Sequence, residues 1–284
     1  MDFFEEVRKL TIKALFSDDV LFNQLVLKGG NAVTLIYGLG MRASFDLDFS
    51  LKGDFADPED AKNRAFRALE SRFSSAGYAV FDTEFVAKPV LHGPDERPWW
   101  GGYELSFKLL RTSDYERLRT RPAKMQREAL TIGPNQKRKL KVDISKNEYV
   151  EGKIDQDLDH VTIRVYTPAM VAAEKIRALC QQMPEYALRG KRTGRARDFY
   201  DIFLAVTGGG VDLQSDDSRM LITEMFSVKR VPLLLLGRLE SQREFHRPDW
   251  PSVTAAVPGR LEEFDFYFDF VLEQIRALET LWNV

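Results

Sequence analysis

The stretch Ser44-Phe45-Asp46-Leu47-Asp48-Phe49-Ser50-Leu51 alternates polar and apolar side chains without interruption. Successive side chains of a β-strand point to opposite faces, so this stretch predicts a strand with one apolar face to bury. The polar face carries Asp46 and Asp48, about 7 Å apart at a rise of about 3.3 Å per residue. Two carboxylates this close repel each other unless a cation lies between them. The stretch therefore indicates a metal site, although acids also alternate on solvated strand faces.

A second alternating stretch, residues 139–145, supplies another acid, Asp143. If this strand pairs with the first, Asp143 joins Asp46 and Asp48 on one polar face. Three carboxylates on neighbouring strands can hold two divalent ions. Such ions activate an attacking oxygen and neutralise a leaving phosphate, so the three acids predict metal-assisted chemistry on a phosphate.

A glycine turn, Lys28-Gly29-Gly30-Asn31, precedes the acids and opens a helix predicted over 31–37. Glycine lets the backbone approach a ligand, and a helix N-terminus offers N–H groups to phosphates. The chain has no Walker motif, and Gly38-Leu39-Gly40 lacks the third glycine of a dinucleotide fingerprint. The turn therefore predicts a nucleotide site of another type.

The composition of the 284 residues is that of an ordinary globular protein, with 44% hydrophobic and 30% charged residues. The single cysteine, Cys180, excludes an intramolecular disulfide and indicates a reducing compartment. The three histidines are far apart in sequence, which disfavours a structural zinc site. The acidic N-terminus does not resemble a signal peptide, and no apolar run is long enough to cross a membrane. We expect a cytoplasmic protein with no membrane contact.

The order of predicted elements divides the chain near residue 166. Helices are predicted over 2–16, 31–37 and 58–73, and strands over 23–27, 44–51, 78–86, 103–110, 137–145 and 161–166. Thr167-Pro168 then begins a helix to Gln182, and the rest of the chain is predicted to be helix and loop. The pattern predicts an α/β domain (an α+β mixed sheet) over 1–166 and an α-helical domain over 167–284.

Four segments resemble, in order, the motifs of the AbiEii/AbiGii-type nucleotidyltransferase-like toxins, a branch of the DNA polymerase β-like nucleotidyltransferase superfamily. These segments are Gly29-Gly30-Asn31-Ala32 with Arg42 to Asp48, then Lys141-Val142-Asp143, Glu174 to Leu179 and Arg197 to Ile202. Asn31 stands where the family usually has a small hydroxyl residue. Residues 203–284 carry no such motif.

The resemblance implies a nucleotidyltransferase fold in which the helical domain completes the active-site cleft. It implies that Asp46, Asp48 and Asp143 bind Mg²⁺ or Mn²⁺, that Lys175 contacts the phosphates of an NTP, and that Asp198 assists near the site. The implied nucleotide contacts are Gly29, Gly30, Asn31, Arg42, Ser44 and Lys175. It further implies the toxin of a type IV toxin–antitoxin or abortive-infection system, with an antitoxin as partner and RNA, above all the tRNA 3′ end, as acceptor.

Several of these side chains have a plainer interpretation. Lys175 lies among apolar positions of its helix, so its ammonium group must reach an anion or extend to solvent. Asp201 has Arg197 four residues before it and could form a surface ion pair. Lys28 could be a solvated strand end. Arg42 and Ser44 could position the loop or contact the nucleotide.

Two basic stretches flank the predicted site residues. Residues 111–141 hold ten Lys and Arg against three acids, and residues 189–197 hold five basic residues and no acid. Such stretches suit an RNA backbone, although a charge run is most often a solvated surface.

Other functions stay open at this point. The chain could transfer a nucleotide to a protein such as an antitoxin, or bind nucleotide or RNA without turnover. A metal-dependent glycosyltransferase also uses Asp-x-Asp, but too few residues precede Asp46 for its nucleotide-binding unit.

Overall fold

The computed structural model describes residues 2–40, 46–89, 100–133, 136–188 and 191–283. The chain forms two compact units. The sheet unit contains Met1–Leu27, Phe45–Asn147 and Asp155–Val165, and the helical unit contains Lys28–Ser44, Glu148–Ile154 and Tyr166–Val284. The sequence predicts a single boundary near 166, whereas the helical unit also includes the glycine turn and residues 148–154.

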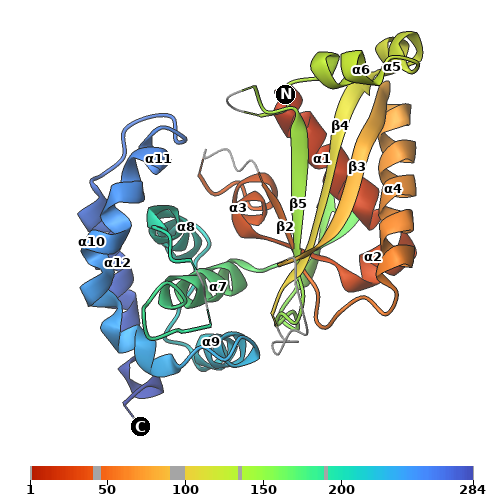
Figure 1. The fold of residues 1–284 in the computed structure, drawn as a ribbon. Coiled ribbons are helices and arrows are strands. Elements are labelled where there is room, and N and C mark those ends of the chain that lie inside the picture. Colours follow the sequence, from red (N-terminus) through yellow and green to blue (C-terminus); the bar gives the residue numbers. More distant parts are fainter. Residues whose placement is uncertain (1, 41–45, 90–99, 134–135, 189–190, 284) are drawn as a thin grey trace. The chain divides into compact units, whose positions relative to one another are not determined.

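The strands form one mixed sheet in the order β3-β4-β5-β2-β1-β7-β6 (Figure 1). They are β1 (Val26–Lys28), β2 (Leu47–Ser50), β3 (Tyr78–Lys88), β4 (Gly102–Arg111), β5 (Lys139–Ser145), β6 (Ile154–Leu158) and β7 (Val161–Val165). The pairs β2–β5 and β1–β7 are parallel, and β3–β4 and β4–β5 are antiparallel. The predicted α/β fold with a mixed sheet is therefore confirmed.

The apolar face of the sheet packs against two helices of the same unit, α1 (Phe3–Phe16) and α4 (Pro58–Ser75). Leu47 and Phe49 of β2 are fully buried, and the ring of Phe49 lies 5.8 Å from that of Phe16. Phe73 of α4 meets Phe107 of β4 at 5.5 Å. This packing buries the apolar side of the acid-bearing strand, as its alternation predicts.

Helix α4 begins where the sequence predicts, because the Asp57 carboxylate accepts hydrogen bonds from the backbone N–H groups of Glu59 and Asp60. The strand predicted over 23–27 is shorter than expected. Asp18 caps an additional helix, α2 (Asp19–Gln24), so β1 starts only at Val26. Two short helices, α5 (Thr112–Leu118) and α6 (Pro122–Glu128), and strand β6 were not predicted.

After residue 166 the described chain is helical, in line with the sequence. Its elements are α7 (Pro168–Cys180), α8 (Ala196–Thr207), α9 (Asp216–Val228), η3 (Leu233–Gln242), α10 (Arg243–His246), η4 (Arg247–Asp249), α11 (Trp250–Thr254), α12 (Phe264–Arg276) and η5 (Glu279–Leu281). Two aromatic residues of α12, Phe264 and Phe268, are buried and pack on Phe199 of α8, whereas Phe266 is exposed. No helix in the described part of the chain is long and apolar enough to span a membrane.

Candidate active site

Three carboxylates lie in one row across the polar face of the sheet. Strand β2 pairs with β5 so that Asp48 is opposite Asp143, and β5 pairs with β4 so that Asp143 is opposite Glu104. Residues directly opposite each other on paired strands share a face. The structure therefore brings Asp48 and Asp143 together as the alternation predicts, and it adds Glu104, which the sequence analysis did not identify.

Glu104 is held by two lysines. Its Oε2 lies 2.6 Å from Nζ of Lys88 and 2.9 Å from Nζ of Lys141, and its side chain is only 12% exposed. These ion pairs outweigh the burial of Glu104 and keep its pKa below the usual range. The alternation along 102–111, which places Glu104 among the polar positions, was the signal that could have identified it.

The other acids of this face differ in their surroundings. Burial, together with the negative charges of Glu104 and Asp46, raises the pKa of Asp143. Asp46 is half exposed, and its carboxylate lies 3.6 Å from Nζ of Lys137. A carboxylate whose pKa rises because of neighbouring acids is one that a cation would stabilise.

The donor set of this face consists of carboxylate oxygens, which suit hard ions such as Mg²⁺ or Mn²⁺. Asp48 and Asp143 are in register, and Asp46 precedes Asp48 by two residues. Among the residues that the structure describes, no three His, Cys, Asp or Glu side chains form a group that could hold a metal ion. The chemistry of the face fits a divalent ion, whereas a converged three-ligand cage is not present in the described residues.

The glycine turn belongs to the helical unit and follows β1 directly. Gly29 has a φ of 71°, a left-handed conformation that side chains other than glycine rarely adopt. The helix that follows is shorter and less regular than predicted: α3 (Gly29–Asn31) runs into the π-helical turn η1 (Ala32–Ile36). Its dipole is correspondingly weak, so phosphate binding here would depend on the individual backbone N–H groups. Asn31 is fully buried.

Two predicted nucleotide contacts, Arg42 and Ser44, lie outside the described residues. That these residues position the loop, or that they contact the nucleotide, therefore stay two predictions from the sequence.

Lys28 is not a solvated strand end, because it belongs to a buried charge cluster of the helical unit. Its ammonium group lies 3.6 Å from Glu148 and 3.8 Å from Glu174. Glu148 also pairs with Arg177 at 2.8 Å and with Lys229 at 3.3 Å, and all these side chains except Glu174 are at least nine-tenths buried. The cluster thus joins the residue before the glycine turn to the third motif.

The charges in this cluster oppose the effect of burial. Burial disfavours the charged form of Glu148, but Arg177, Lys28 and Lys229 together hold its pKa well below the usual range. Burial, with the charges of Arg177 and Lys28, lowers the pKa of Lys229 to about 8, although Glu148 acts in the other direction. Glu148 and Lys229 lie outside all four motifs, and nothing in their local sequence indicated a shared site.

Lys175 reaches two anions rather than solvent. Its Nζ lies 2.9 Å from Oδ1 of Asp198 and 2.8 Å from Oδ2 of Asp201, and all three side chains are at most 6% exposed. Arg195 donates to the other oxygen of Asp198. Burial opposes the charge of Asp198, but Arg195 and Lys175 lower its pKa strongly. The structure thus joins the predicted residues Lys175 and Asp198, and Asp201 belongs to this group rather than to a surface pair.

His246 supports this group from the C-terminal part of the chain. It is fully buried, its Nδ1 accepts a hydrogen bond from the backbone N–H of Arg195 at 3.1 Å, and its ring packs on Phe199. Burial, together with the charges of Arg195 and Arg192, lowers the pKa of His246 to about 4, against the opposing effect of Asp198. The ring is therefore neutral at physiological pH.

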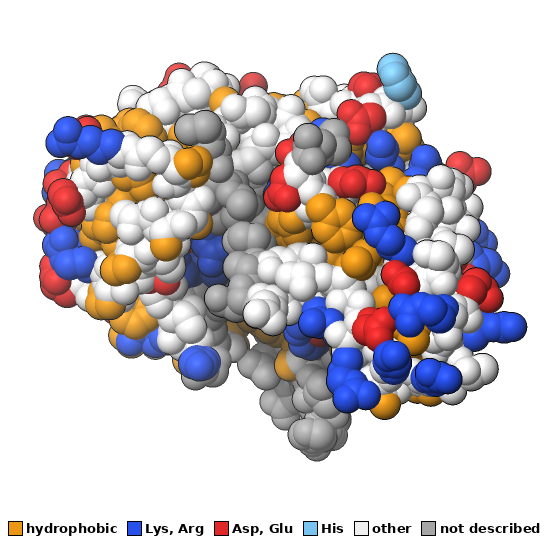
Figure 2. Space-filling model, turned by 90° about the horizontal axis from the view of Figure 1, so that it is seen from above, with side chains coloured by type: hydrophobic (Ala, Val, Ile, Leu, Met, Phe, Trp, Pro, Cys, Tyr) orange, Lys and Arg blue, Asp and Glu red, His pale blue; other side chains and the backbone are white. Residues whose placement is uncertain are grey.

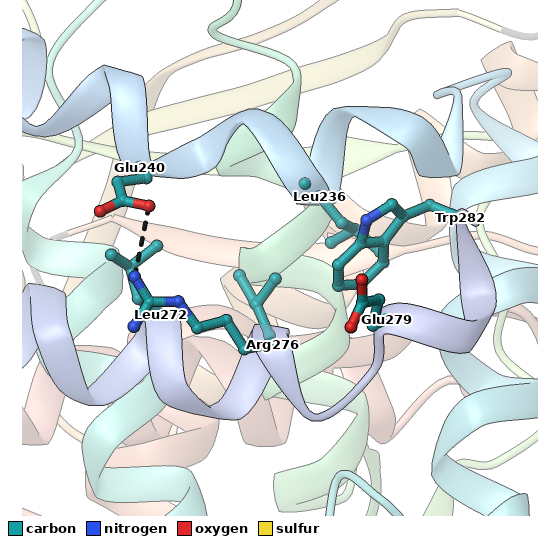
Figure 3. A pocket seen from close by; sticks show the side chains of 8 residues that line it. Leu236, Glu240, Leu272, Arg276, Glu279 and Trp282 are labelled. Carbon is teal, nitrogen blue, oxygen red and sulfur yellow. Dashed lines mark hydrogen bonds and ion pairs between the residues drawn. The ribbon is translucent and has the colours of Figure 1, made fainter.

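A pocket of about 220 Å³ lies elsewhere in the helical unit, between η3, α12 and η5 (Figure 3). It is lined by Leu236, Leu272, Ile275 and Trp282, with the ion pair between Glu240 and Arg276 beside them. None of the predicted site residues lines it, so we do not assign the active site to this pocket.

We expect Lys175→Met to lower the free energy of unfolding by about 3–5 kcal/mol, because it leaves Asp198 and Asp201 buried without their shared cation. Urea unfolding followed by circular dichroism measures the change. The triple variant Lys175→Met, Asp198→Asn, Asp201→Asn should regain part of this loss, since the uncompensated charges are removed. A loss below about 1 kcal/mol would contradict the buried pairing.

We expect His246 to make stability fall as the pH drops from about 6.5 to about 4. Its folded-state pKa is about 4 against the ordinary histidine pKa of 6.5, so the unfolded chain binds more protons in this window. The full effect is about 3 kcal/mol, at about 1.4 kcal/mol for each pH unit. His246→Asn keeps an acceptor but does not titrate, so the pH dependence of unfolding in the two proteins should differ by this amount. Parallel curves would exclude the effect.

Three comparisons with known proteins bear on this geometry. A family model described as "Nucleotidyl transferase AbiEii toxin, Type IV TA system" matches residues 12–274. The comparison with curated proteins finds no match. Among solved structures, a candidate nucleotidyltransferase from H. pylori has 14% identity and a TM-score of 0.47, covering 98% of this chain and 94% of its own. JHP933 from Helicobacter pylori has 16% identity and a TM-score of 0.43, covering 98% of this chain and 90% of its own.

An antigenic nucleotidyltransferase-like protein from Paracoccidioides brasiliensis has 15% identity and a TM-score of 0.39, covering 88% of this chain and 94% of its own. These structural likenesses are remote, and the assignment rests on the family model, which spans nearly the whole chain. The resemblance found in the four motifs is thereby confirmed. The chain belongs to the AbiEii family of nucleotidyltransferase toxins of type IV toxin–antitoxin systems.

Proposed function

We propose that this nucleotidyltransferase moves a nucleotide from an NTP to an RNA hydroxyl, at the 3′ end of tRNA, and that the reaction requires Mg²⁺ or Mn²⁺. The observation that carries the proposal is the row of carboxylates in which Asp48 is opposite Asp143. Membership in a toxin family of type IV systems supports an NTP as substrate and an antitoxin as partner.

The acids have distinct parts in this proposal. Asp46, Asp48 and Asp143 would hold the metal ion, which when bound supplies charge neutralisation for the triphosphate and activation of the attacking hydroxyl. Burial and the neighbouring acids raise the pKa of Asp143, and Glu104 pairs with Lys141 on the same strand. The polar face thus keeps its acids in register, while its lysines Lys88 and Lys141 are paired with Glu104.

The phosphate contacts in this proposal come from the helical unit. The left-handed turn at Gly29 would let the backbone of Gly30 and Asn31 approach the phosphates closely. Lys175 is held between Asp198 and Asp201. A cation that is fixed in place can stabilise the negative charge that develops on the phosphates during transfer. Asp198 would act through this positioning of Lys175.

RNA as acceptor is supported by the basic residues of α5 and α6. Some of them pair with local acids, as Arg117 does with Asp114 and Glu128, whereas Arg121 and Arg127 are exposed. Figure 2 shows Lys and Arg side chains interspersed with acids over one face of the molecule. Exposed arginines of this kind would contact phosphates of an RNA backbone.

We expect the wild-type protein to transfer label from a radiolabelled NTP to tRNA in the presence of Mg²⁺, and Asp48→Asn to lower kcat at least about 100-fold. The loss follows because Asp48 lies directly opposite Asp143 and two residues after Asp46, so it would be a ligand of the metal ion. Asp155→Asn is the matched control, since Asp155 is an exposed acid on β6 and should leave kcat unchanged. Each of the four NTPs is tested with total tRNA.

Gel separation of the products distinguishes the outcomes. Label on protein instead of RNA would replace the proposed acceptor by a protein, and no transfer with any NTP would overturn the proposal. Chelation of the divalent ion with EDTA should abolish transfer, and full activity in EDTA would remove the metal from the mechanism.

We expect the double variant Arg121→Gln, Arg127→Gln to weaken tRNA binding and to make it less dependent on salt. Each phosphate contact that is lost should reduce the slope of log K against log salt concentration by about 1. Fluorescence anisotropy at several KCl concentrations measures the slope. Arg276→Gln, at a 63% exposed side chain on α12, is the control, and equal slopes in all three proteins would exclude RNA contact by α6.

A further inference from the structure

The first turn of α8 is held by side chains from other parts of the helical unit. The start of this helix has no capping side chain of its own. Instead the backbone N–H of Arg195 donates to Nδ1 of His246 at 3.1 Å, and that of Ala196 donates to Oδ2 of Asp249 at 3.0 Å. On the chain just before, the N–H of Thr193 donates to Oε1 of Gln182 at 2.9 Å. Unpaired N–H groups at a helix start are costly when buried, and these acceptors satisfy them.

The close approach of Asp249 depends on Gly194. A Cβ added at Gly194 would lie 2.9 Å from Cβ of Asp249 and 3.6 Å from the backbone oxygen of Phe245. The first of these distances is shorter than real Cβ contacts allow, so only glycine lets Asp249 reach the helix start. Asp249 of η4 and Gly194, just before α8, therefore pack too closely for a side chain at position 194.

The turn that is held in this way carries Asp198. The N–H of Asp198 donates to the carbonyl of Arg195, and its carboxylate binds Lys175 through one oxygen and Arg195 through the other. A shift of residues 195–196 would therefore move Asp198, and with it the ammonium group of Lys175. All of these residues belong to the helical unit.

We propose that His246 and Asp249 are positioning residues for nucleotidyl transfer: by capping α8 from outside the four motifs, they hold Asp198 and Lys175 in their reactive placement. This inference rests on the proposed function of Lys175 and Asp198. It gives a role to two residues in a region of the chain to which no motif assigns one. Neither side chain needs to touch the nucleotide.

Removing a helix cap also lowers stability, so a purely structural contribution must be separated from positioning. Ser215 offers the matched control, because its hydroxyl caps α9 of the same unit by accepting from the N–H of Ser218. Ser215→Ala removes a cap of the same kind without touching α8. The conservative variants Asp249→Asn and His246→Asn each keep an acceptor at the helix start.

The experiment compares steady-state transfer kinetics and thermal unfolding of the full chain for wild type, Asp249→Ala, His246→Leu, the two Asn variants and Ser215→Ala. We expect Asp249→Ala and His246→Leu to lower kcat about 10-fold to 100-fold, with the KM for NTP within about twofold of wild type. The Asn variants should recover kcat to within about threefold. Ser215→Ala should lose thermal stability comparably and keep its kcat.

Amide hydrogen exchange of residues 196–201 provides a readout that does not depend on activity. We expect faster exchange there in Asp249→Ala and unchanged exchange there in Ser215→Ala. Unchanged exchange in Asp249→Ala, or unchanged kcat in an active protein, would overturn the inference and leave the proposed function standing. Absence of transfer by the wild type would instead overturn the proposed function, while the exchange data would still decide whether the cap holds α8.

Discussion

Burial of the apolar face of the sheet against α1 and α4 fixes the register of β2 on β5, and this register places the carboxylates. A slip of one residue would turn Leu47 and Phe49 to the polar face and Asp48 into the core. The cost of such a slip is large, since Phe49 packs on Phe16. The acids are therefore held opposite each other by hydrophobic packing on the other side of the strand, and their mutual repulsion is tolerated because that packing outweighs it.

Buried charge organises the helical unit in a comparable way. Lys175 pairs with Asp198 and Asp201, and Glu148 forms ion pairs with Lys28, Arg177 and Lys229. Such groups contribute little net stability relative to apolar residues, but removing one of the charged side chains lowers the stability of the fold strongly. They therefore specify placement more than they stabilise the fold. One cluster fixes the chain immediately before the glycine turn, and the other fixes the first turn of α8.

The C-terminal part of the chain completes both arrangements. Lys229 follows α9, and His246 and Asp249 lie at the ends of α10 and η4. None of these residues belongs to a motif. Lys229 pairs with Glu148, which in turn binds Arg177 of the third motif, whereas His246 and Asp249 accept hydrogen bonds at the start of α8, the helix that carries the fourth. Residues outside any motif can thus hold the motif residues in place. The reason is that a buried N–H group or carboxylate needs a partner, and that partner can come from a distant part of the chain.

The sequence by itself determined the strands that carry Asp48 and Asp143, the boundary helices at Pro58 and Pro168, and the family, because alternation, caps and ordered motifs are local signals. It also indicated that Lys175, on an apolar helix face, must reach either an anion or solvent. Only the tertiary structure decided that the anions are Asp198 and Asp201, that Glu104 lies beside Asp143, and that Glu148, Lys229, His246 and Asp249 support the motifs. These pairings join residues far apart in the chain, and their partners are selected by burial and packing, which no local pattern records.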